Sequence, residues 1–481
     1  MPKEFIVAIE LGSSKMTGIA GKKNLDGSIT VLAVVKEDST SCIRKGVVYN
    51  IDKTAQCLTN IVTKLKNTLK TDIAYVYVGV GGQSIRSVRN VIVKDLTGES
   101  IVTQQMVDEV MDCNRTMSYP EQEILNAVTQ EYKVDNQFQP DPVGIQCSRL
   151  EGNFLNILLR KAFYKNLNKC FDQAGIAIAE MRLAPLAMAD SVLTEAEKRA
   201  GCVLVDLGAD TTTVSVYHKN ILRHLAVIPL GGNNITKDIA SLQMEDQEAE
   251  QMKLKYGCAF TDNADIDNSL KLPIDQERTV DSRKFIEIVE GRMEEIIENV
   301  WFQVPNEYVD KLLGGIILTG GGANMPAIER AFRNHTHIEK IRTAKFVNMT
   351  INSTYMEATA HDGTMNTVLG LLAKGNLNCA GEELDEIGDL FNGQAKTPVQ
   401  PTDRRARQPH ETEQGVIRTQ REKEQAEDEA RKKKEEEERQ AQEAEEARKA
   451  EEERQRKENS LFNRIKRGLT KLGRDIVSEE D

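Results

Sequence analysis

Two distant segments of the chain repeat one pattern. Residues 7–15 read VAIELGSSK and residues 204–212 read LVDLGADTT, so each is an apolar run ending in an acid, a leucine, a glycine and small or hydroxyl-bearing residues. A second strand-like stretch follows each, at 16–20 and at 214–217. Glycine at a tight hairpin lets backbone N–H groups approach phosphate oxygens, and a carboxylate just before the turn can hold hydrated Mg²⁺. The repeat therefore predicts a duplicated α/β fold whose two halves grip one nucleotide.

A third element strengthens this prediction, since either hairpin alone could be an ordinary glycine turn. Residues 315–326 read GIILTGGGANMP, which is typical of a buried strand, a glycine turn and a helix with Pro326 near its first turn. The glycines do not complete the G-x-G-x-x-G pattern of a dinucleotide-binding fold, and the chain has no G-x-x-x-x-G-K-[ST] phosphate loop. The sequence therefore argues against both of those nucleotide-binding folds.

The chain divides by composition into a body and three further segments. Residues 1 to about 375 alternate strand-like runs with helical patterns, and Asp52 and Ser282 stand where side-chain oxygens could cap helices. From about 83 to 162 the pattern changes to short strands, at 88–93 and 154–159, around a helix at 104–114, which predicts an inserted subdomain. The body is followed by a polar, disordered linker at 376–415, a charged stretch at 416–458 and an amphipathic end at 459–481.

The charged stretch has neither glycine nor proline and consists mostly of Glu, Lys, Arg, Gln and Ala. Opposite charges stand three or four residues apart, as in Lys434 and Glu438, which favours a helix. No apolar heptad predicts a coiled coil. A semi-rigid, partly helical spacer and a solvated disordered tail are both consistent with this pattern.

The final segment is predicted to form an amphipathic helix that lies in a membrane interface. Apolar side chains fall on one arc of its helical wheel, and basic side chains occupy the opposite face. A basic face in an acidic protein suits anionic lipid headgroups, although the helix could instead dock on the body. The predicted membrane-binding residues are Leu461, Phe462, Ile465, Leu469, Leu472 and Ile476 on the apolar arc and Arg464, Arg467, Lys471 and Arg474 opposite.

Charge and cysteine usage narrow the partners and the compartment. The net charge of −12 argues against a nucleic-acid partner, because phosphates attract basic surfaces. The eight cysteines show no metal-ligand spacing, which favours a reducing, cytosolic compartment. No signal peptide and no apolar run of about 20 residues is visible, so we expect no membrane span.

The order of these motifs resembles the actin, Hsp70 and sugar-kinase superfamily. More narrowly, the chain resembles the FtsA family of bacterial cell division proteins, through the C-terminal amphipathic helix, the insertion and five motifs. These motifs are AIELGSSK at 8–15, YVGVGG at 77–82, VIPLGGNNITKDI at 227–239, AEQMKLKYG at 249–257 and the segment at 316–322 that ends in TGGG.

The resemblance implies an α/β, actin-like, duplicated two-lobed ATPase fold. An FtsA-type subdomain would be inserted into the first lobe, and a linker, a spacer and the amphipathic helix would follow the second lobe. The implied divisions of the body are a first lobe at 1–200 with its insertion at about 83–162, and a second lobe at 201–375 with a small subdomain at about 233–310.

The resemblance also implies a site for ATP and Mg²⁺. Glu10 and Asp206 would stand near the metal and hold it through water, while Glu250 and Lys253 would reach the ribose. Without the resemblance, Glu250 and Lys253 read as an ordinary surface ion pair. The other implied nucleotide-binding residues are Gly12, Ser13, Ser14 and Lys15 in the first hairpin, Gly208, Thr211 and Thr212 in the second, Gly231 and Gly232 at the border, and Gly320, Gly321 and Gly322 beside the adenosine.

The function implied by the resemblance is that of an ATP-binding membrane tether in cell division. Such a protein would fix the FtsZ ring to the cytoplasmic face of the plasma membrane at the division site and help to assemble the divisome. Its partners would be FtsZ, through a surface that includes Arg283, further copies of itself in an actin-like filament, anionic lipids and later division proteins. A phosphotransferase or ATPase of the same superfold, or a scaffold like the pilus-assembly ATPases, is the alternative.

The second hairpin departs from the family pattern D-x-G-G-G-T-x-D. Ala209 and Asp210 replace two glycines, and Thr213 replaces the closing acid. Asp210 adds negative charge close to the expected phosphates. We therefore expect nucleotide binding with weak hydrolysis at most, and we assign no catalytic residue.

Overall fold

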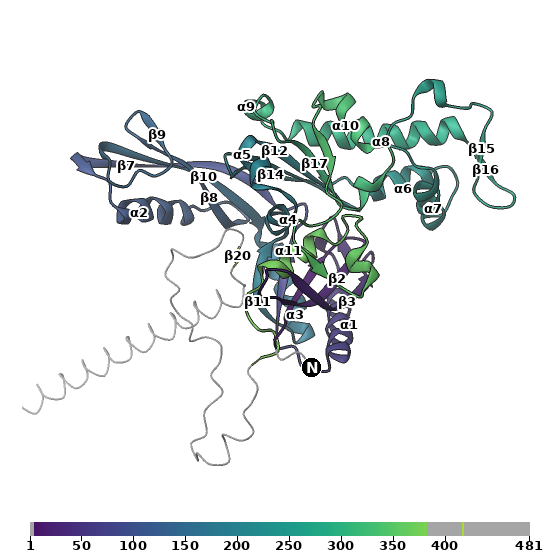
Figure 1. Cartoon of the computed structure of the whole chain (residues 1–481), viewed down its shortest axis with the longest axis horizontal. Coiled ribbons are helices and arrows are strands. Elements are labelled where there is room, and N and C mark those ends of the chain that lie inside the picture. The colour runs from purple at the N-terminus through teal and green to yellow at the C-terminus, as the bar shows by residue number, and fades with distance from the viewer. Residues whose placement is uncertain (1–3, 382–415, 418–481) are drawn as a thin grey trace, which may run out of the picture. The chain divides into compact units, whose positions relative to one another are not determined.

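The computed structural model describes residues 4–381 and 416–417 (Figure 1). The predicted membrane helix, nearly all of the predicted spacer and most of the predicted linker lie outside the described residues. Within the described residues, no helix is both long enough and apolar enough to cross a membrane.

The first half of the chain builds a seven-stranded sheet on an antiparallel meander. Strands β1, β2 and β3 pair antiparallel, whereas β6 and then β11 add in parallel on the other side of β1. Both hydrophobic strands at its centre, β1 and β6, are buried. In sheet order the strands are β19 (Ile351–Asn352), β3 (Ile29–Asp38), β2 (Lys15–Lys23), β1 (Ile6–Leu11), β6 (Tyr75–Val80), β11 (Ala177–Leu183) and β20 (Val416–Ile417).

The second half repeats this topology, as the paired motifs predict. Strands β12, β13 and β14 form the antiparallel meander, and β17 adds in parallel to β12 as β6 does to β1. The corresponding strands are β18 (Ile341–Thr343), β17 (Gly315–Thr319), β12 (Cys202–Leu207), β13 (Thr212–His218) and β14 (Ile221–Ile228).

The insertion belongs to the first half by sequence but extends the sheet of the second half. Its strand β7 pairs with β14, and Gln130 fixes the junction. The amide of Gln130 donates to the Leu222 carbonyl at 2.9 Å and accepts from Arg223 at 3.2 Å. Helix α2 packs on β7 and β10 (Figure 1). The insertion comprises β7 (Arg86–Ile101), α2 (Gln104–Arg115), β8 (Gln122–Val134), β9 (Gln137–Gln139) and β10 (Gln146–Arg160).

Helices cover the first sheet and bury its core. Helix α1 is amphipathic, and the side chain of Asn50 caps it by accepting from the backbone N–H of Lys53 at 3.0 Å. The predicted cap Asp52 lies instead inside the first turn, and Ser282 is likewise the first residue of its helix, after Asp281. The helices of this half are α1 (Ile51–Leu69), α3 (Lys161–Ala174), α4 (Ala184–Val192) and, returning from the end of the body, α11 (Asn366–Lys374); α5 (Glu195–Ala200) leads into β12.

A small subdomain projects from the second sheet, between β14 and β17. Its helices share one hydrophobic core with the second sheet, to which α8 contributes Phe285, Val289 and Met293, all fully or almost fully buried. Figure 1 shows α6, α7 and α8 side by side beyond the end of the sheet. The elements are α6 (Gly232–Ala240), α7 (Asp246–Tyr256), β15 (Lys271–Pro273), β16 (Thr279–Asp281), α8 (Ser282–Phe302) and α9 (Asn306–Val309), with α10 (Ile328–Thr336) following β17.

Candidate nucleotide site

One cavity of about 570 Å³ lies where the two repeated hairpins meet the glycine turn after β17. Helices α6 and α7 and the loop before α11 also contribute to its lining, as do residues of α4, α8 and α11. This volume falls within the range of about 300–1,000 Å³ that is usual for small-molecule sites. The fold thus brings together three motifs that are far apart in the sequence.

The two hairpins make the same turn. A Cβ atom on Gly12 would lie 2.6 Å from the carbonyl oxygen of Lys15, and one on Gly208 would lie 2.8 Å from that of Thr211. In the second hairpin, the N–H of Gly208 donates to this carbonyl at 2.9 Å. The two Cβ–oxygen distances, 2.6 and 2.8 Å, are shorter than a side chain tolerates, so only glycine permits this tight turn. With no side chain in the way, backbone N–H groups at the tip of each hairpin can face an anion.

The glycine turn after β17 approaches the second hairpin closely. Gly320 has φ +82°, a left-handed conformation that favours glycine. A Cβ atom there would lie 2.3 Å from Oδ1 of Asp206 and 2.7 Å from the carbonyl oxygen of Leu207. Any larger residue at position 320 would therefore push the turn away from the acid.

An acid is the penultimate residue of the first strand of each hairpin, and both acids line the cavity. Burial and then the neighbouring charge of Asp206 raise the pKa of Glu10 to about 7, although Lys15 opposes this. Burial also raises the pKa of Asp206 to about 6. A divalent cation would offset the cost of ionising both carboxylates together. Mg²⁺ prefers such oxygen ligands together with water. The residues present therefore fit a hydrated Mg²⁺.

Lys253 and Glu250 form a network in the cavity wall rather than an exposed surface pair. The ammonium of Lys253 donates to Glu250 at 2.6 Å, to Thr236 at 2.8 Å and to the carbonyl of Gly232 at 3.1 Å. The Lys253 side chain is only 10% exposed. This network ties α7 to α6, and it presents a carboxylate and a cation to the cavity.

Comparisons with known proteins identify the family of the chain. The family model "Cell division protein FtsA" matches residues 203–370, and the model of the SHS2 domain inserted in FtsA matches residues 82–158. The cell division protein FtsA of Pseudomonas aeruginosa is 31% identical over 339 residues, which is 68% of this chain and 80% of that protein. The chain belongs to the FtsA family.

Other matches bear on the family and on the fold. The FtsA of Porphyromonas gingivalis is 32% identical over 324 residues, covering 66% of this chain and 68% of that protein. A solved structure of a PilM–PilN type IV pilus biogenesis complex matches 77% of this chain and 98% of its own, with a TM-score of 0.53 and 15% identity. The fold is thus actin-like, with the FtsA-type insertion between the first-lobe strands β6 and β11.

Nearly all residues that the FtsA resemblance assigned to nucleotide binding lie around the cavity. The exception is Thr212, which is fully buried and donates to the Leu230 carbonyl at 2.9 Å. Its hydroxyl therefore stabilises the hairpin through the segment after β14 and does not face the cavity. Those that line the cavity are Glu10, Gly12, Ser13, Ser14, Lys15, Asp206, Gly208, Thr211, Gly231, Gly232, Glu250, Lys253, Gly320, Gly321 and Gly322.

Asp210, one of the residues that depart from the family pattern, joins the two lobes. One oxygen of its carboxylate accepts from the backbone N–H of Lys45 at 3.0 Å, and the other accepts from the amide of Asn233 at 2.8 Å. The adjacent Gly46 donates to the hydroxyl of Ser13 at 2.8 Å. Asp210 is thus a contact between the second hairpin and the loop between β4 (Ile43–Arg44) and β5 (Val47–Val48).

Some residues of the cavity were not among those assigned to nucleotide binding from the sequence. Thr17 and Thr213 stand directly opposite Glu10 and Asp206 in their hairpins and line the cavity, and only Thr213 was singled out, as the replacement of the closing acid. The equivalence of the two hairpins could have identified Thr17. Asp362 and Thr367 also line the cavity, but they come from the last loop and helix of the body, where no local motif marks them.

Proposed function

We propose that this member of the FtsA family binds Mg·ATP in the cavity between the two hairpins. The observation that carries the proposal is the pair of equivalent hairpins that present Glu10 and Asp206 to one glycine-lined cavity. These two carboxylates would hold Mg²⁺ through water. The bound ion would neutralise phosphate charge, while backbone N–H groups of the hairpins would bind the phosphate oxygens.

Hydrolysis should be slow. Thr213 stands opposite Asp206, where the superfamily pattern has an acid, so that position offers no second carboxylate to activate water. The same arrangement holds in the first hairpin, where Thr17 stands opposite Glu10. Nucleotide would then serve to hold a conformation rather than to supply chemistry.

Membership of the FtsA family assigns the chain a role in cell division. We propose that this role is to hold FtsZ at the cytoplasmic face of the plasma membrane at the septum and to recruit later division proteins, with the protein attached peripherally through residues 459–481. The proposed FtsZ surface lies on the small subdomain around Arg283. This side chain is 45% exposed and pairs with Glu287 at 3.6 Å. Self-association into an actin-like filament would multiply these contacts.

A reconstitution separates these claims. The full chain is incubated with anionic vesicles, FtsZ and Mg·ATP, and the bound FtsZ is measured by co-sedimentation. FtsZ should pellet only when the chain and anionic lipid are both present, and Arg283→Ala should reduce the pelleted FtsZ while the chain itself still binds the vesicles. Lys169→Ala, at an exposed position of α3 in the other lobe, serves as the control for an altered surface.

Calorimetry tests nucleotide binding independently. Measurable Mg·ATP affinity supports the proposal, and its absence would overturn it. Turnover near the enzyme median of about 10 s⁻¹ would contradict the expectation of slow hydrolysis.

A further inference from the structure

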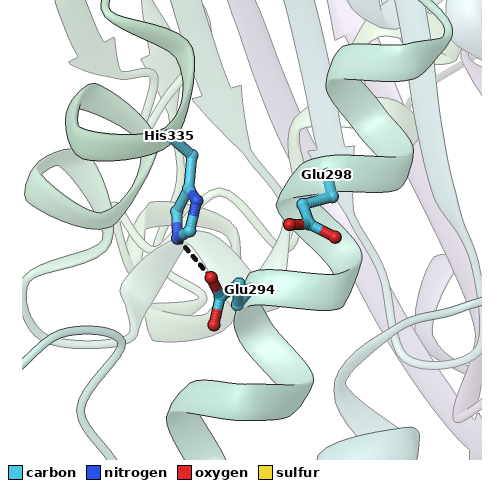
Figure 2. Close-up of side chains that lie close together, drawn as sticks. All are labelled: Glu294, Glu298 and His335. Atoms are coloured by element: carbon cyan, nitrogen blue, oxygen red, sulfur yellow. Dashed lines mark ion pairs between the residues drawn. The ribbon is translucent and has the colours of Figure 1, made fainter.

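Three potential metal ligands meet between α8 and α10, outside the cavity. Glu294 and Glu298 stand four residues apart on α8, so they share one face of that helix, and His335 faces them from α10 (Figure 2). One ligand atom from each of the three lies within 4.8 Å of the others. The imidazole Nε2 of His335 lies 3.9 Å from Oε1 of Glu294.

Among the ion pairs of the described residues, no lysine or arginine pairs with this group. Glu294 pairs only with His335, whereas the next acid along the helix, Glu295, is paired with Arg292. Like charges four residues apart on a helix repel one another, so Glu294 and Glu298 disfavour each other's charge. A cation bound between them would relieve this repulsion.

We propose that Glu294, Glu298 and His335 bind a borderline divalent cation, with Zn²⁺ as the fitting ion. Two carboxylate oxygens and one imidazole nitrogen are ligands that zinc accepts, whereas Mg²⁺ and Ca²⁺ prefer oxygen alone. Tetrahedral zinc at bond lengths near 2.1 Å separates its ligand atoms by about 3.4 Å. The two glutamates are exposed, so small side-chain rotations can close the present separations. Water would complete the coordination.

The ion would link α8, which borders the nucleotide cavity, to α10. Helix α8 contributes Met293 and Ile296 to the cavity wall; Met293 is adjacent in sequence to Glu294, and Ile296 lies midway between Glu294 and Glu298. Helix α10 follows the glycine turn that carries Gly320. Binding at the cluster would therefore brace the wall formed by the small subdomain. Cation binding by these three residues does not require a bound nucleotide.

The single tryptophan of the chain gives a local readout. Trp301 lies on α8, three residues after Glu298 and seven after Glu294, so all three fall on one side of the helix. Co²⁺ replaces Zn²⁺ in nitrogen and oxygen sites and is paramagnetic, so its binding here should quench Trp301 fluorescence. Its absorption spectrum also separates nitrogen and oxygen ligands from cysteine thiolates, which give an intense near-ultraviolet band.

The experiment titrates Co²⁺ into the untagged, chelator-treated full chain and then competes it with Zn²⁺. His335→Asn and Glu298→Gln should each weaken Co²⁺ binding about tenfold or more, since even residues that only orient a ligand cost 10–100-fold. The matched controls His337→Asn and Glu295→Gln should bind like the parent. His337 has φ +57°, which asparagine adopts readily.

Three results of the Co²⁺ titration would overturn the proposal. They are the absence of saturable Co²⁺ quenching in the parent chain, a thiolate band in its complex, and unchanged affinity in both His335→Asn and Glu298→Gln. Zn²⁺ should also raise the thermal midpoint of the parent but not of His335→Asn. Equal competition by Mg²⁺ at the same concentration would show that the imidazole does not contribute, and would likewise contradict the assignment.

Discussion

The two acids of the cavity are held in a state that resists ionisation. For Glu10, the folded pKa of about 7 lies above the ordinary value of 4.5. A carboxyl whose pKa is raised by folding favours the folded state while it is protonated. Its ionisation therefore costs stability as the pH rises through the window between the two pKa values.

This sign gives the first prediction. Glu10→Gln should stabilise the nucleotide-free protein relative to the parent above pH 7, by about 1–3 kcal/mol, and the advantage should vanish near pH 4.5. Thermal midpoints measured across this pH range test the claim, and Mg²⁺ should narrow the difference because it neutralises the carboxylate. The exposed Glu4→Gln serves as the control. A constant difference at all pH values would contradict the electrostatic explanation.

Asp210 gives the second prediction, because its charge and its hydrogen bonds can be separated. Asp210→Asn removes the charge while its amide oxygen can still accept from the Lys45 N–H. It should bind Mg·ATP more tightly, by roughly fivefold for about 1 kcal/mol of relieved repulsion. Asp210→Gly should show a similar gain but also lose about 1 kcal/mol of stability. Calorimetry and chemical denaturation measure the two effects, and weaker binding by both variants would refute the repulsion.

At the scale of residues, the sequence predicts tight turns better than it predicts which distant residues meet in the cavity. The hairpin glycines are visible because their close backbone contacts are local, between residues three apart. Asp362, by contrast, enters the cavity only after the chain returns at the end of the body. The capping of α1 was predicted at the wrong residue because Asn50 and Asp52 both carry suitable oxygens, and only the backbone path decides between them.

At the scale of elements, buried amides hold α2 to the sheet of the insertion. Asn114 on α2 donates to Asn156 on β10 at 2.7 Å, and Asn156 donates back at 3.0 Å. Both side chains are fully buried, and Asn90 on β7 donates to Asn114 at 2.8 Å. The amides of helix and strands thus form hydrogen bonds with one another.

The third prediction concerns this amide pair. Asn114→Ala should destabilise the insertion by about 1–3 kcal/mol or more, because it leaves the amide of Asn156 buried without its partner. Hydrogen exchange of α2 and of β10 should accelerate, while exchange in the first sheet stays unchanged. Gln105→Ala, on the exposed face of α2, is the control. Equal effects of the two substitutions would show that the pair contributes no more than the helix surface does.

The sequence located the insertion, but the predicted strands are shorter than those of the structure. Short strands at 88–93 and 154–159 were predicted, whereas β7 and β10 run for 16 and 15 residues. The parts of these strands outside the predicted ranges carry polar residues and glycines, such as Gly152, over which Phe154 and Val110 pack closely. Strand length there comes from pairing with neighbours, which a local pattern does not report.

At the scale of the whole molecule, the body contains the cavity, and the proposed lipid contact lies in the C-terminal tail. The sequence of the tail places apolar residues on one arc of a predicted helix. The two-lobed fold was predictable because it rests on a repeat. The sheet that the insertion joins was not, because the sequence contains no signal for pairing between β7 and β14.

The fourth prediction tests the tail. Ile465→Glu places a charge in the centre of the apolar arc and should abolish co-sedimentation with anionic vesicles, since burying a carboxylate in lipid is costly. Ser478→Glu, beyond the arc, is the matched control. Mg·ATP affinity should be the same in both variants. Undiminished vesicle binding by Ile465→Glu would show that another surface contacts lipid.

The junction at Gln130 has a consequence for how such a chain can be divided or recombined. The insertion leaves the first half by sequence, joins the sheet of the second, and then returns to the first. A fragment that stops before β12 would carry β7 without β14, and a fragment that begins there would leave the polar edge of β14 open. The two repeated halves are therefore not interchangeable modules. A chimaera that takes one half from a relative would also need that relative's residues on the other side of the junction between the insertion and β14.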